Sequence, residues 1–108
     1  MAVMHEFTDE NFAGEVLGNA APVLVDFTAA WCGPCRMLAP VVEKLNEEWN
    51  GAVKVGKLDI DQHTAVTMRF GVMSVPTLIL FKGGQPVERV AGYVPRERLL
   101  AKLSRHLS

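Results

Sequence analysis

Hydrophobic residues recur along the whole chain, and the period of their recurrence predicts the secondary structure. The run VLVDF, residues 23–27, is largely apolar at consecutive positions, as expected for a strand that is covered on both faces. From residue 34 to residue 49 the apolar positions follow helical spacing, and charged residues occupy the other side. A buried strand followed by an amphipathic helix indicates a layered arrangement of the two.

Turn residues and further apolar runs predict the remaining elements. These are a helix from the amino-cap Thr8 to about Gly18, strands over 52–60 and 76–81, a helix over 64–71, a turn over 82–86, a strand over 87–93 and a helix from Pro95 that buries leucines. The order also leaves room for a short strand before Thr8. The last two strands are joined so closely that they should pair antiparallel.

Alternation of strands and helices followed by a hairpin favours the α/β class, with a central mixed β-sheet of four to five strands flanked by helices on both faces. No repeat, low-complexity tract or linker interrupts the pattern, so we expect residues 1–108 to form a single domain. In such sheets a site tends to form where a strand ends and the chain turns into a helix. Cys32 occupies such a turn.

The composition and charge of the chain exclude several classes of partner. The 108 residues are 49% hydrophobic, and 11 basic residues stand against 12 acidic ones without a block of either sign, so nucleic acid and membrane surfaces are not expected partners. The amino-terminal stretch lacks the pattern of a signal peptide, and no apolar segment approaches the roughly 20 residues that span a bilayer. We therefore expect a cytoplasmic globular protein, and a monomer.

The segment AWCGPCRM, residues 30–37, contains both cysteines of the chain, Cys32 and Cys35. They could be half of a metal site, a structural bridge or a redox couple. A metal site needs about four ligands, and the three histidines are scattered without ligand spacing. A bridge that encloses two residues constrains the unfolded chain little, and the cytosol keeps most thiols reduced. The redox couple is therefore favoured over the other two readings.

The predicted helix start gives the two sulfurs different expected roles. Cys32 should lie at the amino-cap and Cys35 in the first turn, at a separation that a disulfide accepts. The helix amino-terminus favours the thiolate at Cys32, which should attack, whereas Cys35 should face the core, be less exposed and resolve the mixed disulfide. Gly33 permits close approach of another backbone, and Pro34 restrains the loop.

Four segments resemble the thioredoxin family in order and spacing, over essentially all of the chain: VLVDFTAAWCGPCRMLAP, VGKLDIDQ, GVMSVPTLILFKGG and VAGY. WCGPC is typical of the reducing members. The resemblance implies the thioredoxin fold and an enzyme that acts as a protein-disulfide reductase and electron carrier through the Cys32–Cys35 couple. It also implies no bound cofactor or metal, disulfide-containing target proteins, and re-reduction by a thioredoxin reductase that uses NADPH.

The resemblance also implies roles outside the cysteine motif. Asp26 resembles the buried carboxylate that assists proton transfer at the second cysteine, and Lys57 the lysine beside it. Burial within a strand should raise the pKa of Asp26, as a base near neutral pH requires; from the residues alone, an aspartate that caps a loop is the alternative. Thr28 departs from the family, many of whose members have a tryptophan there.

Pro76 resembles the cis-proline of the family, and the residue before it is expected to offer free backbone groups to an extended substrate segment. The expected docking surface around Cys32 comprises Trp31, Gly33, Pro34, Met73, Ser74, Val75, Pro76 and Gly92. Trp49 and the other methionines are expected to serve the core.

Three rival functions remain at this point. The chain could be a redox-independent binding subunit of a larger complex, which uses the docking surface alone. It could also be a metal-binding module, or a disulfide-forming oxidant or isomerase; CGPC and the absence of a signal-peptide pattern count against the last.

Overall fold

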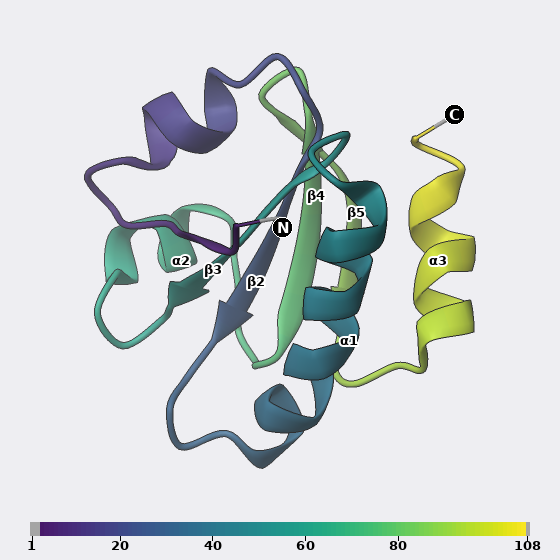
Figure 1. Ribbon diagram of the computed structural model, residues 1–108. Coiled ribbons are helices and arrows are strands. Elements are labelled where there is room, and N and C mark those ends of the chain that lie inside the picture. Colours follow the sequence, from purple (N-terminus) through teal and green to yellow (C-terminus); the bar gives the residue numbers. More distant parts are fainter. Residues whose placement is uncertain (1–2, 108) are drawn as a thin grey trace.

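The computed structural model describes residues 3–107, in which a five-stranded mixed sheet is covered by helices on both faces (Figure 1). Its elements are β1 (His5–Glu6), the π-helical turn η1 (Ala13–Leu17), β2 (Val23–Thr28), α1 (Gly33–Trp49), β3 (Lys54–Asp59), α2 (Thr64–Arg69), β4 (Thr77–Lys82), β5 (Gln85–Ala91) and α3 (Arg96–Ser104). The strand order is β1-β3-β2-β4-β5; the first three strands are parallel, and β4 and β5 are antiparallel to their neighbours. The predicted α/β class and the short first strand are confirmed.

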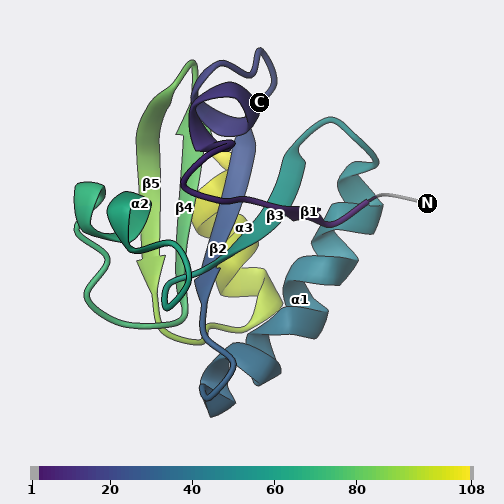
Figure 2. The same ribbon diagram turned by 90° about the vertical axis from the view of Figure 1, so that its left-hand side faces the viewer.

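The helices divide between the two faces of the sheet. α1 and α3 lie on one face, and η1 and α2 lie on the other (Figures 1 and 2). Side chains alternate along β2, so Val25 belongs to the apolar cluster that includes η1 and α2, whereas Leu24 packs with residues of α1 and α3. Asp26 comes two positions after Leu24 and therefore faces α1.

The turn between β4 and β5 is tighter than the sequence predicted. Gly83 and Gly84 both have positive φ angles, 58° and 78°, which suits a two-residue hairpin turn. β5 therefore begins at Gln85 and includes Pro86, whereas the pattern of turn residues predicts Pro86 in the turn. An edge strand tolerates proline because its outer N–H groups need no partner, and β5 is an edge strand of this sheet. The ends of the other elements differ from prediction by a few residues.

Thr8 caps the first helical turn, as predicted. Its Oγ1 accepts a hydrogen bond from the Asn11 N–H at 3.0 Å, and Asn11 Oδ1 accepts one from the Thr8 N–H at 2.7 Å. The Gly18 N–H then donates to the Ala13 carbonyl at 2.8 Å, five residues back, which gives η1 its π-helical geometry. The end of this helix at Gly18 is confirmed, but its start is later than predicted. η1 begins at Ala13 with Phe12 as its N-cap, and Thr8 caps the turn that precedes it.

Gly56 in β3 lies against Phe7. A Cβ atom at this position would be 2.5 Å from a ring carbon of Phe7 and 2.7 Å from the His5 carbonyl oxygen. The Phe7 N–H donates to the Lys57 carbonyl at 2.8 Å. The missing side chain therefore lets β1 and the residue after it close against β3.

The expectation for the large apolar side chains is confirmed in part. Trp49 is half-buried against the cluster of α1 and α3, as predicted. Met37 and Met68 are 60% and 78% exposed, so their assignment to the core is wrong, because both lie outside the buried stripe of their helices. No helix within the described residues is long and apolar enough to cross a membrane.

Candidate functional site

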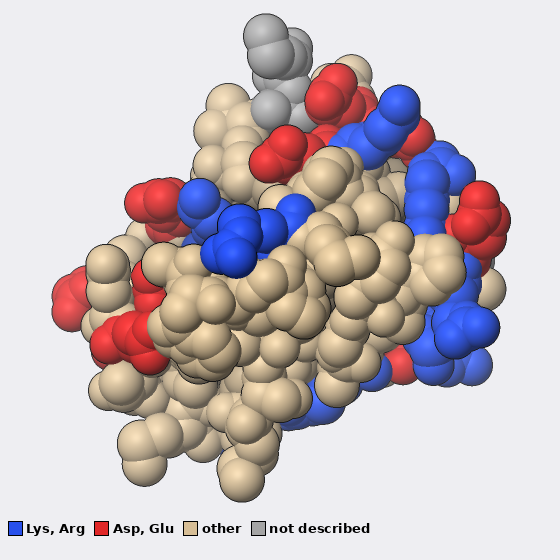
Figure 3. All heavy atoms as spheres, turned by 90° about the horizontal axis from the view of Figure 1, so that it is seen from below, with Lys and Arg blue, Asp and Glu red and all other residues tan. Residues whose placement is uncertain are grey.

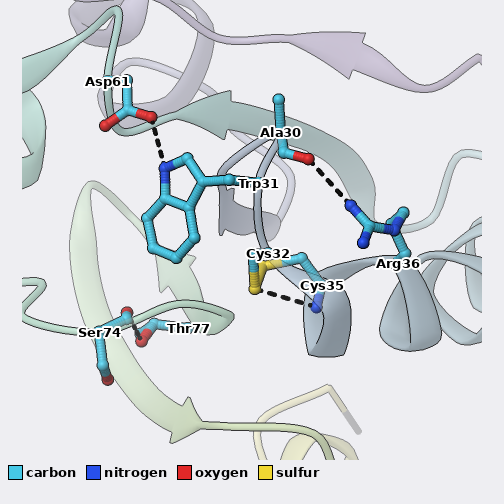
Figure 4. The surroundings of a disulfide bond; sticks show 8 residues. All are labelled: Ala30, Trp31, Cys32, Cys35, Arg36, Asp61, Ser74 and Thr77. Carbon is cyan, nitrogen blue, oxygen red and sulfur yellow. Dashed lines mark hydrogen bonds between the residues drawn. A yellow bond between two sulfur atoms is a disulfide. The ribbon is translucent and has the colours of Figure 1, made fainter.

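The two cysteines lie where β2 gives way to α1, as the pattern of the sequence predicted. Cys32 is the N-cap of α1 and Cys35 lies in its first turn. They form a disulfide with a Cα–Cα distance of 5.3 Å, and Figure 4 shows its surroundings. The prediction that this pair can close without disturbing the helix is confirmed.

Hydrogen bonds hold the loop that carries the sulfurs. The Cys35 N–H donates to Cys32 Sγ at 3.2 Å, and the Arg36 guanidinium donates to the Ala30 carbonyl at 2.9 Å. The Cys32 N–H donates to the Ala29 carbonyl at 3.2 Å. Cys32 Sγ therefore sits at the amino-terminus of α1, where an N–H group points at it.

The expected difference in exposure between the two cysteines is wrong for the disulfide form. Cys32 is 3% and Cys35 is 4% exposed. Both pack in one small cluster with Ala29, against which Ile60 and Val75 lie. Position along the helix, rather than exposure, distinguishes the two sulfurs.

Asp26 is buried in the central strand, 5% exposed, and its Oδ1 has no hydrogen-bond partner among residues 3–107. Burial raises the pKa of Asp26 to about 7, and the nearby Lys57 ammonium acts in the opposite direction. Desolvation dominates because a carboxylate that loses water without gaining donors is costly. The predicted burial and raised pKa are confirmed.

Asp26 shares a pocket with the second cysteine. The pocket has a volume of about 470 Å³, and its lining includes Asp26, Thr28, Cys35 and Lys57. Lys57 is the in-register neighbour of Asp26 on the adjacent strand β3. Thr28 presents a small side chain to this pocket where many family members have an indole. Asp26 and Cys35 therefore line one cavity on the face of the sheet that α1 covers.

Trp31 precedes the disulfide and is 67% exposed. Its indole N–H donates to Asp61 Oδ2 at 2.8 Å (Figure 4). Asp61, in the turn after β3, was not identified from the sequence, because its partner is 30 residues away and no local pattern links the two. The hydrogen bond fixes an exposed aromatic ring beside Cys32.

The segment before β4 lies across from the disulfide. The Val75–Pro76 peptide bond is cis, as the resemblance implied, and Val75 packs against the cysteine cluster. The Gly92 N–H donates to the Pro76 carbonyl at 2.8 Å, and Thr77 Oγ1 donates to the Ser74 carbonyl at 2.8 Å. Within the described chain no backbone hydrogen bond uses the N–H or C=O of Val75.

The residues expected to form the docking surface lie in three segments. Trp31, Gly33 and Pro34 begin α1, residues 73–76 precede β4, and Gly92 follows β5. Met73 is 94% exposed. Figure 3 views the molecule from the end at which β2 passes into α1. Residues without charge cover a broad area from the centre of this face to its lower part, with one basic group near the centre and the other charged groups around the margins.

Two of the three histidines, His63 and His106, have polar partners within the protein. His63 Nδ1 accepts from the Asp9 N–H at 3.3 Å, and His106 Nε2 lies 2.9 Å from Glu88. Asp9, which sequence analysis placed in the first helix, also accepts from the Val66 N–H at 2.9 Å and so caps α2. Across residues 3–107, no three His, Cys, Asp or Glu side chains are grouped as metal ligands would be.

Comparison with known proteins gives a consistent family match. A family model described as Thioredoxin matches residues 3–105. The chain is 55% identical over 97 residues to a protein named Thioredoxin from Alicyclobacillus acidocaldarius, covering 90% of this chain and 91% of that protein. It is 47% identical over 107 residues to Thioredoxin 1 of a Nostoc species, covering 99% and 100% of the two chains. It is also 48% identical over 99 residues to part of a protein named Bifunctional thioredoxin reductase/thioredoxin from Mycobacterium leprae, covering 92% of this chain and 22% of that protein.

Proposed function

This chain belongs to the thioredoxin family, and from that premise we propose how its residues divide the work of a protein-disulfide reductase. The chain is a thiol-disulfide oxidoreductase that acts on disulfide-containing targets. The observation that carries the proposal is the Cys32–Cys35 disulfide at the amino-terminus of α1. A dithiol at this place can open and close while the helix stays intact.

Two thiol-disulfide exchange steps transfer two electrons to the target disulfide. The thiolate of Cys32 attacks one sulfur of a target disulfide, which forms a mixed disulfide and releases the other target sulfur as a thiolate. Cys35 then attacks Cys32 Sγ, which forms the Cys32–Cys35 disulfide and releases the second target thiolate. Two electrons pass to the target, and each released thiolate takes up a proton.

Position along the helix supports this division of roles. Cys32 Sγ accepts a hydrogen bond from the Cys35 N–H at 3.2 Å, and the positive end of the α1 dipole lies at the same place. Both favour a thiolate at Cys32 over one further along the helix. Cys32 is therefore the attacking sulfur in this proposal, and Cys35 is the resolving one.

Asp26 is proposed as the general base for Cys35. The carboxyl group lines the same pocket as Cys35, and burial raises its pKa to about 7, so near neutral pH it can both accept and return a proton. Lys57 is proposed to assist by lowering the cost of the ionised form. The pocket has room for a water molecule to carry the proton between Asp26 and the sulfur.

Replacing Asp26 with asparagine should slow resolution of the mixed disulfide by about 10²-fold near neutral pH and leave the first attack nearly unchanged. Asparagine keeps the size of the side chain and removes the proton acceptor. Rapid-quench measurement of the mixed disulfide and of the released target would separate the two steps. Equal rate constants for the variant and the parent in both steps would refute the role of Asp26.

The docking surface is proposed to bind an extended segment of the target beside its disulfide. The N–H and C=O of Val75, which make no backbone hydrogen bond among residues 3–107, suit strand-like pairing with such a segment. Trp31, Met73 and Pro34 add exposed apolar area. The remaining members are Gly33, Ser74, Pro76 and Gly92. Pro76 is buried and its carbonyl is hydrogen-bonded to the Gly92 N–H, so these two residues support the surface and do not pair with the target. This surface would bind targets of varied sequence, because backbone groups carry the pairing.

Re-reduction is assigned to a thioredoxin reductase that draws electrons from NADPH. The name of the Mycobacterium leprae relative joins a thioredoxin reductase and a thioredoxin in one protein, which supports such a partnership for this chain. In this proposal the chain itself carries electrons only on its two sulfurs and needs no resident cofactor. A reducing cytoplasm is the compartment that suits a carrier kept in the dithiol form.

An insulin-reduction assay tests the proposed function. With a thioredoxin reductase and NADPH, the protein should consume NADPH and precipitate the insulin B chain, and a variant with serine at both cysteines should do neither. A parallel arm with dithiothreitol as reductant separates the exchange reaction from recognition by the reductase. Failure in the dithiothreitol arm would sink the reductase function, whereas failure with NADPH alone would sink only the proposed partner.

The same double variant tests the binding-subunit alternative. If a strain or extract that depends on the protein retains its full biological function with serine at both positions, that function rests on binding and not on electron transfer. Loss of the function with an unchanged fold supports the reductase.

A further inference from the structure

Three charged residues form a row across the sheet on the face covered by α1. Glu6 of β1 is in register with Lys57 of β3, and Lys57 is in register with Asp26 of β2. In-register neighbours on adjacent strands project from the same face of a sheet. All three line the pocket that also reaches Cys35. A single lysine therefore lies between two carboxyl groups.

The two carboxyl groups differ in exposure. The Lys57 Nζ lies 3.9 Å from Glu6 Oε1, and these two side chains are 52% and 77% exposed. Asp26 is 5% exposed, and no hydrogen bond within the described structure reaches its Oδ1. Within residues 3–107, the Lys57 ammonium is thus ion-paired with Glu6 on the solvent side of the row, and no hydrogen bond joins it to Asp26 Oδ1 on the buried side.

We propose that Glu6 is a positioning residue that holds the Lys57 ammonium toward the outer edge of the pocket and so governs when Asp26 takes up and releases a proton. The inference rests on the proposed role of Asp26 as the base for Cys35. Glu6 touches neither sulfur, and it acts on Asp26 mainly through Lys57.

Electrostatics give the sign of the effect. Lys57 lowers the pKa of Asp26 against the larger upward effect of burial. Without the Glu6 carboxylate, Lys57 is free to turn toward Asp26, and a negative charge near Asp26 is also lost. Both changes favour the ionised form of Asp26. Removing the charge of Glu6 should therefore lower the pKa of Asp26.

Other charged groups line the same pocket, and the experiment must leave these residues unchanged. Arg36 and Glu43 face it from α1, Asp59 from the end of β3, and His63 from the start of α2. None of them is altered by a substitution at residue 6. A change in the titration of Asp26 on that substitution is then assigned to Glu6.

The test is an NMR titration of the Asp26 side-chain carboxyl carbon in the oxidised protein, with Asp26→Asn used to assign the signal. Glu6→Gln should move the midpoint downward by about 0.2 to 0.7 pH unit, the size that exposed ion pairs produce. High salt should shrink the difference. Glu6→Asp keeps the charge, so its midpoint should lie closer to that of the parent, with at least half of the shift caused by Glu6→Gln recovered. Glu10→Gln, at an exposed residue outside the pocket, should leave the midpoint unchanged.

A Lys57→Met background decides whether Glu6 acts through the lysine. There the shift caused by Glu6→Gln should fall to less than half of its size in the parent. The same shift in both backgrounds would overturn the proposal, since Glu6 would then act on Asp26 directly. No shift, an upward shift, or an equal shift from Glu10→Gln would overturn it as well.

The NMR readout is independent of catalysis, so it separates this inference from the function on which it rests. The pH profile of the resolution step should move with the NMR midpoint if Asp26 is the base. If the midpoint moves and the rate profile does not, the role of Asp26 fails and the positioning by Glu6 stands.

Discussion

Replacing Cys35 with serine should leave the protein covalently joined to its target. Cys32 retains its place at the amino-terminus of α1 and can still attack, but the neighbouring sulfur that would release the target is gone. Incubation of the reduced variant with insulin, or with an extract, should yield mixed disulfides on a non-reducing gel that dithiothreitol dissolves. Multiple turnover should fall by on the order of 10³-fold or more.

Cys32→Ser is the matched control for that result. It removes the attacking sulfur and leaves Cys35 buried beside Asp26. We expect no accumulated complex and no turnover. If complexes accumulate on Cys35 with Cys32 replaced, and not in the reverse case, the assignment of the two sulfurs is inverted. Mass spectrometry of the trapped peptide identifies the sulfur that holds the target.

Replacing Asp26 with asparagine should stabilise the oxidised protein, and the gain should grow with pH. The pKa of Asp26 is raised from 3.8 to about 7 on folding. Between these values the folded protein holds a proton that the unfolded chain has lost, so folding becomes less favourable as pH rises through that window. The full penalty, reached above about pH 7, is about 4 kcal/mol. Asparagine does not titrate and avoids it.

Urea unfolding at about pH 4, 6 and 8 measures this effect. The difference in unfolding free energy between variant and parent should be small at the lowest pH and approach its maximum at the highest. A Glu10→Gln variant, altered at an exposed carboxyl, serves as control and should show no such trend. A difference that stays constant across the three conditions would mean that Asp26 does not titrate with a raised pKa.

The two effects expected of Asp26→Asn, slower resolution of the mixed disulfide and a more stable fold, describe one compromise. Burying a carboxyl group in the central strand lowers the stability of the fold near neutral pH and above. The same burial sets the pKa of Asp26 close to neutral, where a base can exchange a proton with a thiol. In the proposed mechanism, this loss of stability is the cost of placing a proton acceptor next to Cys35.

Much of the fold follows from the period of the apolar residues. The continuous run in β2 predicted cover on both faces, and the spacing in α1 predicted its buried stripe; both are confirmed. The start of β5 was missed because Pro86 was taken as the end of a turn. A proline fits a strand when that strand lies at the edge of its sheet. The order of strands in a sheet cannot be predicted from a local stretch of sequence.

The residues of the functional site were likewise predictable from the sequence only in part. The local motif predicted the cysteine pair, and its position after a buried strand predicted the helix start; burial of Asp26 followed from its place in an apolar run. The family resemblance, rather than the residues alone, identified Lys57 and Pro76. Asp61, Asp9 and Glu6 were not identified, since each acts on a partner brought near only by folding.

Gly56 shows how a residue without functional groups constrains the evolution of a redox site. Any side chain there would meet the Phe7 ring and the His5 carbonyl, and would push β1 away from β3. Glu6 belongs to β1, so its reach to Lys57 depends on that contact. The number of sequences that can encode this electrostatic arrangement is therefore limited by a position whose residue has no charged, hydrogen-bonding or nucleophilic side chain.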